Sequence, residues 1–232
     1  MPARATWAIV PAKRFDRAKT RLSCVLETAQ RAALARAMFD DLIDALAAVA
    51  AIDAICVVSD DAALVRDGGR CQYLYDPDGG TLNDAVQLAV DYAVAHGAAA
   101  CCILHADLPL ASGGRIAALL DGHRGGVTLV PDRHRAGTNV MVCTPGDALP
   151  FCYGPRSLDA HRAAAVQRGI ACSLVEDDAL GLDLDDCADL CAWLALHSNG
   201  QPLPGRRSAA LAGSLVESLR RSPDAESSRR SA

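Results

Sequence analysis

Short apolar runs alternate with longer helical patterns along most of the chain. The runs at 7–10, 54–59 and 100–104 contain almost no polar residue, which is typical of strands buried on both faces of a sheet. A helical pattern over 28–50 places its apolar residues at three- and four-residue spacing. Strands that alternate with helices predict βαβ units. We therefore expect an α/β fold in which helices flank one mixed but mostly parallel sheet.

The remaining elements continue this alternation until the composition changes near the end. Further helices are predicted over 81–96, 112–121, 158–168 and 185–196, and further strands over 72–75, 127–130, 139–143 and 171–175. The polar turn at 131–137 predicts antiparallel pairing near one edge of the sheet. From about Ser198, Gly, Pro, Ser and Arg dominate. We expect one domain over 1–197 and a mobile tail over 198–232, with one or two helical turns at most.

Charge and cysteine content restrict the class of protein. The net charge is −5, so there is no overall basic field for nucleic acid. The ten cysteines form no C-x-x-C pair and no zinc-ribbon spacing, which predicts buried thiols in a reducing compartment. No signal peptide is recognised, and Asp44 and Asp53 interrupt the longest apolar stretch. We expect a cytoplasmic protein with no membrane and no nucleic-acid partner.

A basic loop follows the first predicted strand. Five cations fall between Lys13 and Arg21, within the segment 11–22. A cationic loop after a strand of an α/β sheet is suited to a polyphosphate, with Lys13 and either Lys19 or Arg21 neutralising the phosphates. The loop has no glycine and is neither a P-loop nor a dinucleotide fingerprint. The alternative is an ordinary solvated charged loop.

Two acidic segments can supply metal ligands. Asp107 follows the central strand, where a poorly solvated carboxylate needs a cation. Asp183 lies in a second acidic segment, with Asp185 on the same side as a further candidate. Magnesium prefers one or two carboxylates plus phosphate oxygens, so Asp107 and Asp183 predict a Mg²⁺ site. The alternative role of Asp107 is to cap the next helix, and Asp185 or Asp186 alternatively caps the final helix. His105 is expected to be a packed core histidine.

The segment 76–83 has the features of a base pocket. Gly79 and Gly80 allow the backbone to approach a planar ligand closely. Asn83 carries both a donor and an acceptor, which suits the edge of a nucleobase. The alternative is a plain helix start, with Thr81 as its cap.

A second anion site is expected near two small-residue motifs. Thr138 enters a strand, and Gly154 to Ser157 precede a helix, where backbone N–H groups and the helix dipole favour an anion. Arg156 and His161 can add positive charge. The alternative is ordinary turn and cap chemistry.

Five motifs in order resemble one known family. P-x-K-R-(x)4-K-T-R-L, G-T-L-N, A-D-L-P, G-T-N and Y-G-P-x-S-(x)3-H look like the guanylyltransferases of coenzyme F420 biosynthesis, which act on 2-phospho-L-lactate or phosphoenolpyruvate. The similarity covers about residues 6–196. Two departures are visible: Ala136 stands where the family often has glycine, and Tyr153 stands where phenylalanine is common.

The resemblance implies a fold and a division of roles. It implies a single-domain, Rossmann-like nucleotidyltransferase fold that uses GTP and magnesium. It assigns catalysis to Lys13 and Asp107 and metal binding to Asp107 and Asp183. The GTP-binding residues would be Lys13, Lys19, Arg21, Gly80 and Asn83, and the acceptor-binding residues Thr138, Gly154 and Ser157.

Three questions remain open from the sequence. The acceptor can be phosphoenolpyruvate, 2-phospho-L-lactate or 3-phospho-D-glycerate. The alternative functions are another cofactor or sugar-phosphate nucleotidyltransferase of this fold, or a non-catalytic nucleotide-binding module. An edge strand or the alanine-rich helix over 28–50 could support a homodimer.

Overall fold

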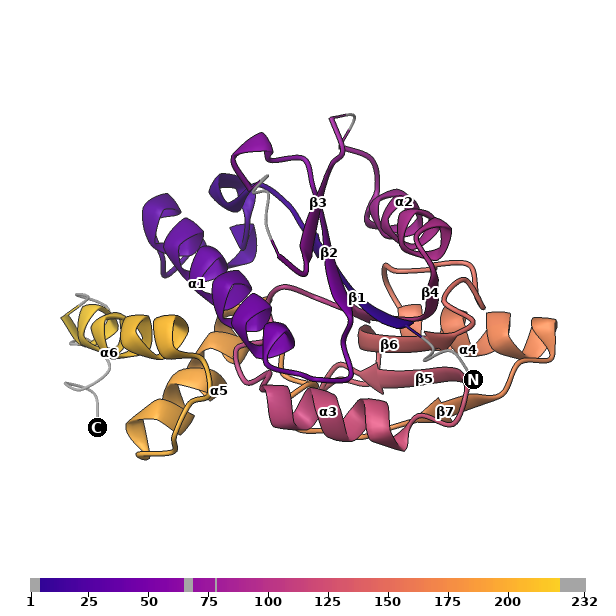
Figure 1. The fold of residues 1–232 in the computed structure, drawn as a ribbon. Helices are drawn as coiled ribbons and strands as arrows, with labels where there is room; N and C mark the ends of the chain where they lie inside the picture. Colours follow the sequence, from indigo (N-terminus) through magenta and orange to yellow (C-terminus); the bar gives the residue numbers. More distant parts are fainter. Residues whose placement is uncertain (1–4, 65–68, 78, 222–232) are drawn as a thin grey trace.

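A seven-stranded sheet forms the centre of the molecule, with helices on both faces (Figure 1). The computed structural model describes residues 5–64, 69–77 and 79–221, with side chains through 216. The strand order is β3-β2-β1-β4-β6-β5-β7. The strands are β1 (Ala5–Ala12), β2 (Ala54–Ser59), β3 (Cys71–Tyr75), β4 (Ala98–Leu104), β5 (Gly126–Pro131), β6 (Thr138–Thr144) and β7 (Cys172–Leu174).

Most neighbouring strands run parallel, as the sequence predicts. β1 pairs in parallel with both β2 and β4, and β5 pairs in parallel with β7. β6 is antiparallel to both of its neighbours, β4 and β5. The antiparallel strand therefore lies inside the sheet rather than near its edge, because β5 and β7 extend the sheet beyond it.

The helices pack against the sheet through two apolar layers. The helices are α1 (Thr28–Ala47), α2 (Leu82–Ala95), α3 (Gly113–Gly122), α4 (Ser157–Arg168), α5 (Cys187–Ser198) and α6 (Arg206–Arg221). One layer joins α2 and α4 to one face of the sheet, and the other joins α1 and α3 to the opposite face. Burial of these side chains at about 25 cal/mol per Å² is the main stabilising term.

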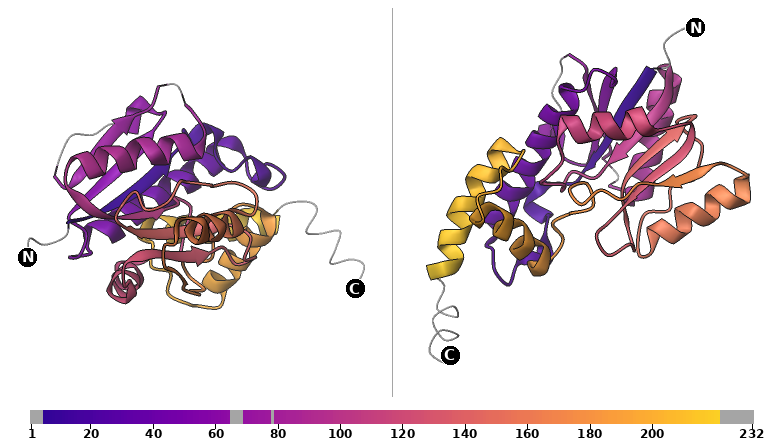
Figure 2. Two further views of the ribbon diagram at one scale, coloured as in Figure 1. Left: turned by 90° about the vertical axis from the view of Figure 1, so that its right-hand side faces the viewer. Right: turned by 90° about the horizontal axis from the view of Figure 1, so that it is seen from below.

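A third apolar cluster corrects the predicted domain boundary. The segment expected to be a mobile tail contains α6, which packs beside α1 and α5 (Figure 2). Ala212 and Leu215 of α6 are buried there with Leu22, Leu26 and Trp193.

Polar contacts also attach α6 to α1. Asp41 accepts hydrogen bonds from the backbone N–H and the hydroxyl of Ser208 at 2.8 and 2.7 Å. Composition misled the prediction because a helix with a narrow apolar stripe can have a very polar average.

The cysteines only partly follow the prediction of buried thiols. All ten are free; Cys56, Cys101, Cys102 and Cys143 are buried. Cys24, Cys172 and Cys191 are exposed. The Sγ atoms of Cys24 and Cys187 lie 2.8 Å apart. Within the described ranges no helix is long and apolar enough to cross a membrane.

Candidate active site

The basic loop and Asp107 lie at the same edge of the sheet. β1 and β4 are adjacent and parallel, so the segments that follow them leave the sheet on the same side. Asp107 is not a helix cap, because the hydroxyl of Ser112 accepts from the Arg115 N–H at the start of α3. The carboxylate is therefore available to the loop opposite.

Lys19 joins the basic loop to both acidic segments. Its ammonium group donates to the Asp107 carboxylate and, at 3.1 Å, to Asp185 Oδ1. The Lys19 side chain is only 8% exposed, and its backbone is left-handed with φ 54°. Burial alone would lower the pKa of Lys19, but Asp107 and Asp185 outweigh burial and hold the pKa above its usual value. Lys19 is thus a charged internal residue of this site.

Arg21 lies at the solvent-exposed rim of this site. Its guanidinium is 3.8 Å from Asp185, and its side chain is 74% exposed. Asp185 therefore serves as an ion partner of the basic loop rather than as a free metal ligand. Asp186 caps α5 by accepting from the N–H groups of Ala188 and Asp189 at 2.8 and 3.0 Å.

Asp107 and Asp183 have the properties of cation ligands. Oδ1 of Asp107 is buried and has no hydrogen-bond partner among the described residues. Burial, with the nearby Asp107 charge, raises the pKa of Asp183 to about 6. Asn139 orients Asp183 by donating to its Oδ1 at 3.2 Å. An orphaned carboxylate oxygen beside a second carboxylate that resists ionisation fits a divalent cation.

Few of the described side chains are placed to hold a metal ion. Over residues 5–64, 69–77 and 79–221, no group of three or more His, Cys, Asp or Glu is arranged to hold a metal ion. Two carboxylates match the preference of Mg²⁺ for few protein ligands completed by phosphate oxygens. They do not resemble a closed structural site.

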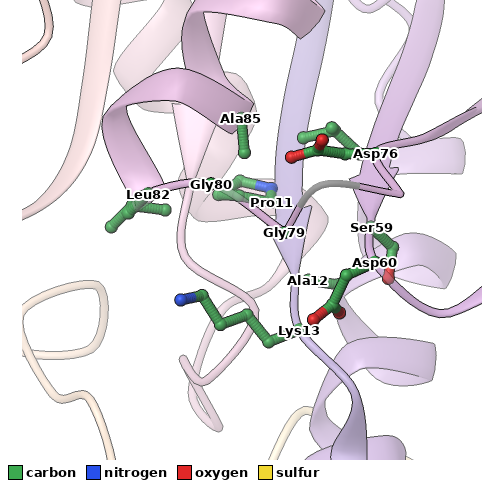
Figure 3. Close-up of a pocket in the computed structure, with 11 residues that line it drawn as sticks. Pro11, Ala12, Lys13, Ser59, Asp60, Asp76, Gly79, Gly80, Leu82 and Ala85 are labelled. Atoms are coloured by element: carbon green, nitrogen blue, oxygen red, sulfur yellow. The ribbon is translucent and has the colours of Figure 1, made fainter.

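A first cavity lies beside the end of β3 (Figure 3). Its walls include the apolar side chains of Pro11, Val58 and Leu82. Gly79, with φ 56°, and Gly80 form one side, as expected for a close backbone approach. This cavity lies at the segment 76–83, where the sequence predicts a base pocket, and the Asp76 carboxylate lies in its wall.

A second cavity continues from the first toward Asp107. The two share Pro11, Ala12, Lys13 and Leu82. The second also contains Lys19, His105 and Asp107 in its lining. Lys13 is exposed and forms no ion pair with any described residue. A nucleotide can therefore extend from the glycine turn past Lys13 to the aspartate.

Asn83 does not present a free edge to this pocket. Its amide donates to the Tyr153 carbonyl at 3.1 Å, and its Oδ1 accepts from the Tyr153 N–H at 2.7 Å. The assignment of Asn83 to the base edge therefore does not match the structure. Asn83 instead ties α2 to the segment before Gly154. Thr81 caps α2 with Asp84 in a reciprocal capping box, as the alternative predicted.

The two predicted acceptor motifs converge at the start of α4. The Leu158 N–H donates to the Ala136 carbonyl at 3.1 Å, which places the loop before Thr138 beside Ser157. Gly154 has φ 140°, a conformation that L side chains rarely adopt. Ser157 is buried, and no hydrogen bond joins its hydroxyl to another described group.

His161 contributes no charge to this cradle. The Cys152 N–H donates to Nε2 at 2.9 Å, so Nδ1 carries the proton and donates to Thr138 Oγ1 at 3.1 Å. Burial lowers the pKa of His161 to about 4. Since Thr138 Oγ1 accepts the hydrogen bond from His161 Nδ1, the proton of the Thr138 hydroxyl group points away from His161. Arg156 pairs with Asp159 at 2.8 Å and is 80% exposed.

We expect His161→Gln to make the free energy of unfolding depend less steeply on pH between about pH 4 and 6.5. A buried neutral histidine with a folded pKa of about 4 and an unfolded pKa near 6.5 stabilises the protein above pH 6.5. That contribution, about 3 kcal/mol in total, is lost as pH falls from 6.5 to 4. Asp183 acts oppositely, because its raised pKa favours the folded state below about pH 6.

Urea denaturation of wild type and His161→Gln between pH 4 and 7.5 isolates the histidine, because the Asp183 contribution cancels in the difference. Parallel profiles for the two proteins would contradict the neutral assignment.

His105 lies between the metal ligands and the acceptor cradle. Its ring centroid is 5.2 Å from that of Tyr153, and it lines the second cavity. Its Nε2 is buried with no partner among the described groups, and burial lowers its pKa. The expectation of a packed core histidine therefore describes its burial but not its position at the site.

Asn139 and Asp76 were not singled out as site residues from the sequence. Asn139 holds Asp183, and Asp76 lines the first cavity. His161 was named as a source of charge, whereas in the structure it orients Thr138. The G-T-N motif contains Asn139, and its position directly after Thr138 was the available signal.

The comparisons with known proteins identify the family to which the chain is similar. Residues 6–203 match a family model described as "Guanylyl transferase CofC like". A phosphoenolpyruvate guanylyltransferase from Conexibacter woesei is 35% identical, with 94% of this chain and 99% of that protein covered. A 2-phospho-L-lactate guanylyltransferase from Methanothermobacter thermautotrophicus is 31% identical, with 84% and 86% covered.

A solved structure of similar fold comes from Desulfovibrio desulfuricans G20, a candidate nucleotide-diphospho-sugar transferase. Its TM-score is 0.73 at 18% identity, and 93% of this chain and 96% of that chain are covered. The sheet, the shared edge and the family match lead to one assignment: the chain belongs to the CofC-like guanylyl transferase family and is a nucleotidyltransferase.

Proposed function

We propose that the protein transfers GMP from GTP to the phosphate of phosphoenolpyruvate and releases pyrophosphate, as a step of coenzyme F420 biosynthesis in the cytoplasm. The observation that carries this proposal is the pair of adjoining cavities, which join a pocket with glycine and apolar walls to Lys13, Lys19 and Asp107. The acceptor assignment is supported by the relative from C. woesei, which is named for phosphoenolpyruvate.

The residues divide the substrates between them. The base occupies the first cavity, against Gly80, and the triphosphate extends past Lys13 toward Lys19. Arg21 is at the outer rim, where its charge can attract the anionic nucleotide. The acceptor carboxylate and phosphate are held by Thr138, Gly154 and Ser157 at the N-terminus of α4.

The transfer needs positioning and charge neutralisation rather than a general base. A phosphate oxygen of the acceptor is already anionic at neutral pH and attacks the α-phosphorus of GTP in line with the departing pyrophosphate. Lys13 and Lys19 stabilise the charge that develops on the pyrophosphate. Magnesium held by Asp107 and Asp183 would supply further positive charge to the phosphates when bound.

One competition experiment tests the function. The protein is incubated with GTP, Mg²⁺ and equal amounts of phosphoenolpyruvate, 2-phospho-L-lactate and 3-phospho-D-glycerate, and the products are identified by mass. The phosphoenolpyruvate adduct is expected to dominate. A dominant lactate or glycerate adduct changes the acceptor, and no GTP-dependent product with any acid refutes the proposal.

Ser157→Ala is expected to raise the KM for the acceptor by about 10- to 100-fold, because one hydrogen bond to a charged group contributes about 1.5–3 kcal/mol. The KM for GTP should be unchanged, since Ser157 lies at α4 and outside both cavity linings. Steady-state kinetics with each substrate varied in turn measure both constants. Equal effects on the two KM values would contradict the assignment of Ser157 to the acceptor.

A further inference from the structure

We propose that Asp76 selects guanine over other bases by accepting hydrogen bonds from N1–H and the 2-amino group. This inference rests on the proposed placement of the nucleotide in the first cavity. It goes beyond that placement because it names the group that reads the base.

The backbone holds Asp76 in a fixed position at the end of β3. Its N–H donates to the Ser59 carbonyl at 2.8 Å, which continues the pairing of β2 with β3 by one residue. Its carbonyl accepts from the Gly79 N–H at 3.3 Å, which closes the turn toward the glycines. The carboxylate is thus presented by a strand end rather than by a free loop.

The Asp76 carboxylate faces the cavity without a protein partner. Figure 3 shows it pointing from the end of β3 across the pocket toward Gly80 and Ala85. It forms no side-chain hydrogen bond or ion pair with any described residue. Since it is half-buried, a ligand that donates two hydrogen bonds would satisfy it.

Among the described residues that line this cavity, the other acidic side chain is that of Asp60, which already has a partner. Oδ1 of Asp60 accepts from the Arg14 N–H at 2.9 Å and so fixes the start of the basic loop. Figure 3 shows Asp60 beside Lys13. Asp76 is the carboxylate on the opposite side, beyond the glycine turn.

The cavity orients a nucleotide with its base toward Asp76. Pro11, Val58 and Leu82 offer apolar surface for the flat faces of a purine. The Lys13 ammonium points toward the Leu82 side of the pocket, away from Asp76 (Figure 3). Lys13 also lines the second cavity, so the phosphates extend toward Asp107. The Watson–Crick edge of the base then remains for Asp76.

The chemistry of that edge distinguishes the bases. Guanine presents two adjacent donors, which match the two oxygens of an ionised carboxylate. Adenine presents a lone pair at N1, which repels a carboxylate, and rejection of this kind adds to specificity. Xanthine carries an oxygen where guanine carries the 2-amino group. An amide in place of the carboxylate can accept from N1–H and donate to that oxygen.

The test is Asp76→Asn with four nucleotides: GTP, XTP, ITP and ATP. Equilibrium binding and product formation are both measured, with circular dichroism to confirm the fold. We expect GTP affinity to fall about 100-fold, in line with loss of charge-assisted hydrogen bonds, and XTP to bind more tightly than GTP. The matched control Asp91→Asn removes an exposed charge from α2 and should keep the wild-type order.

The possible results distinguish a failure of the inference about Asp76 from a failure of the proposed function. An Asp76→Asn protein that keeps the wild-type preference for GTP over XTP overturns the inference. Wild type offers a check without a variant, because ITP lacks the 2-amino group and should bind about 10-fold more weakly than GTP; equal affinities would also overturn it. A wild-type protein that binds no GTP at all refutes the proposed function instead.

Discussion

Asp107→Asn is expected to lower the rate of guanylyl transfer about 1000-fold, with the fold intact. The substitution keeps the side-chain volume but removes the charge that faces Lys19 and leaves Asp183 as the single carboxylate of the pair. Loss of one group that stabilises developing charge commonly lowers the rate 10²- to 10³-fold. The expected loss is at the upper end because Asp107 pairs with Lys19 and is also expected to hold the magnesium ion. Pyrophosphate release at saturating GTP and phosphoenolpyruvate measures the effect.

The control for Asp107→Asn is Asp40→Asn. Asp40 also accepts from a cation, Arg36 at 2.8 Å, but it lies on α1 and lines neither cavity. The Asp40→Asn protein should catalyse guanylyl transfer at the wild-type rate. If Asp107→Asn also turned over at the wild-type rate with Mg²⁺ present, the metal assignment would be wrong.

Lys19→Met is expected to reduce both stability and turnover. Methionine fills similar space but leaves Asp107 and Asp185 without their shared cation, and breaking a buried ion pair costs about 3–5 kcal/mol. The partial exposure of Asp107 and the half-exposure of Asp185 place the effect at the lower end of that range. We also expect kcat to fall by about 10²-fold, since Lys19 lines the second cavity, into which the proposed function extends the triphosphate.

Thermal unfolding with EDTA and with excess Mg²⁺ tests the electrostatic cause. Mg²⁺ should raise the Tm of Lys19→Met more than that of wild type, because the variant has more uncompensated negative charge. Arg21→Met serves as the stability control, because a largely exposed side chain 3.8 Å from its partner contributes little. Identical Tm values for wild type and Lys19→Met in EDTA would show that Lys19 does not neutralise Asp107.

The sequence predicted which segments meet, because that follows from strand order. Parallel neighbours bring Lys13 and Asp107 to one edge, and hydrophobic periodicity identified the strands and most of the helices. The sequence could not show which of Lys19 and Arg21 lies inside the site. The answer depends on the left-handed backbone conformation of Lys19 and on its contact with Asp185, which is 166 positions away.

The assignments that failed concern polar side chains with several available partners. Asn83 was matched to a base edge on its donor and acceptor alone, but the nearby Tyr153 backbone offers the complementary pair. His161 was expected to add charge, whereas its burial and the Cys152 N–H keep it neutral. Such outcomes depend on tertiary contacts that a single sequence does not reveal.

The cluster formed by α5, α6 and Leu22 affects where the protein can be shortened. The family match ends at residue 203, three residues before α6 begins at Arg206. Cutting there would remove Ala212 and Leu215 from their contact with Leu22 and Leu26. Leu22 directly follows Arg21, and Leu26 lies four residues further along the chain. A recombinant fragment trimmed to the family boundary would therefore expose an apolar surface and weaken the packing that holds the end of the basic loop.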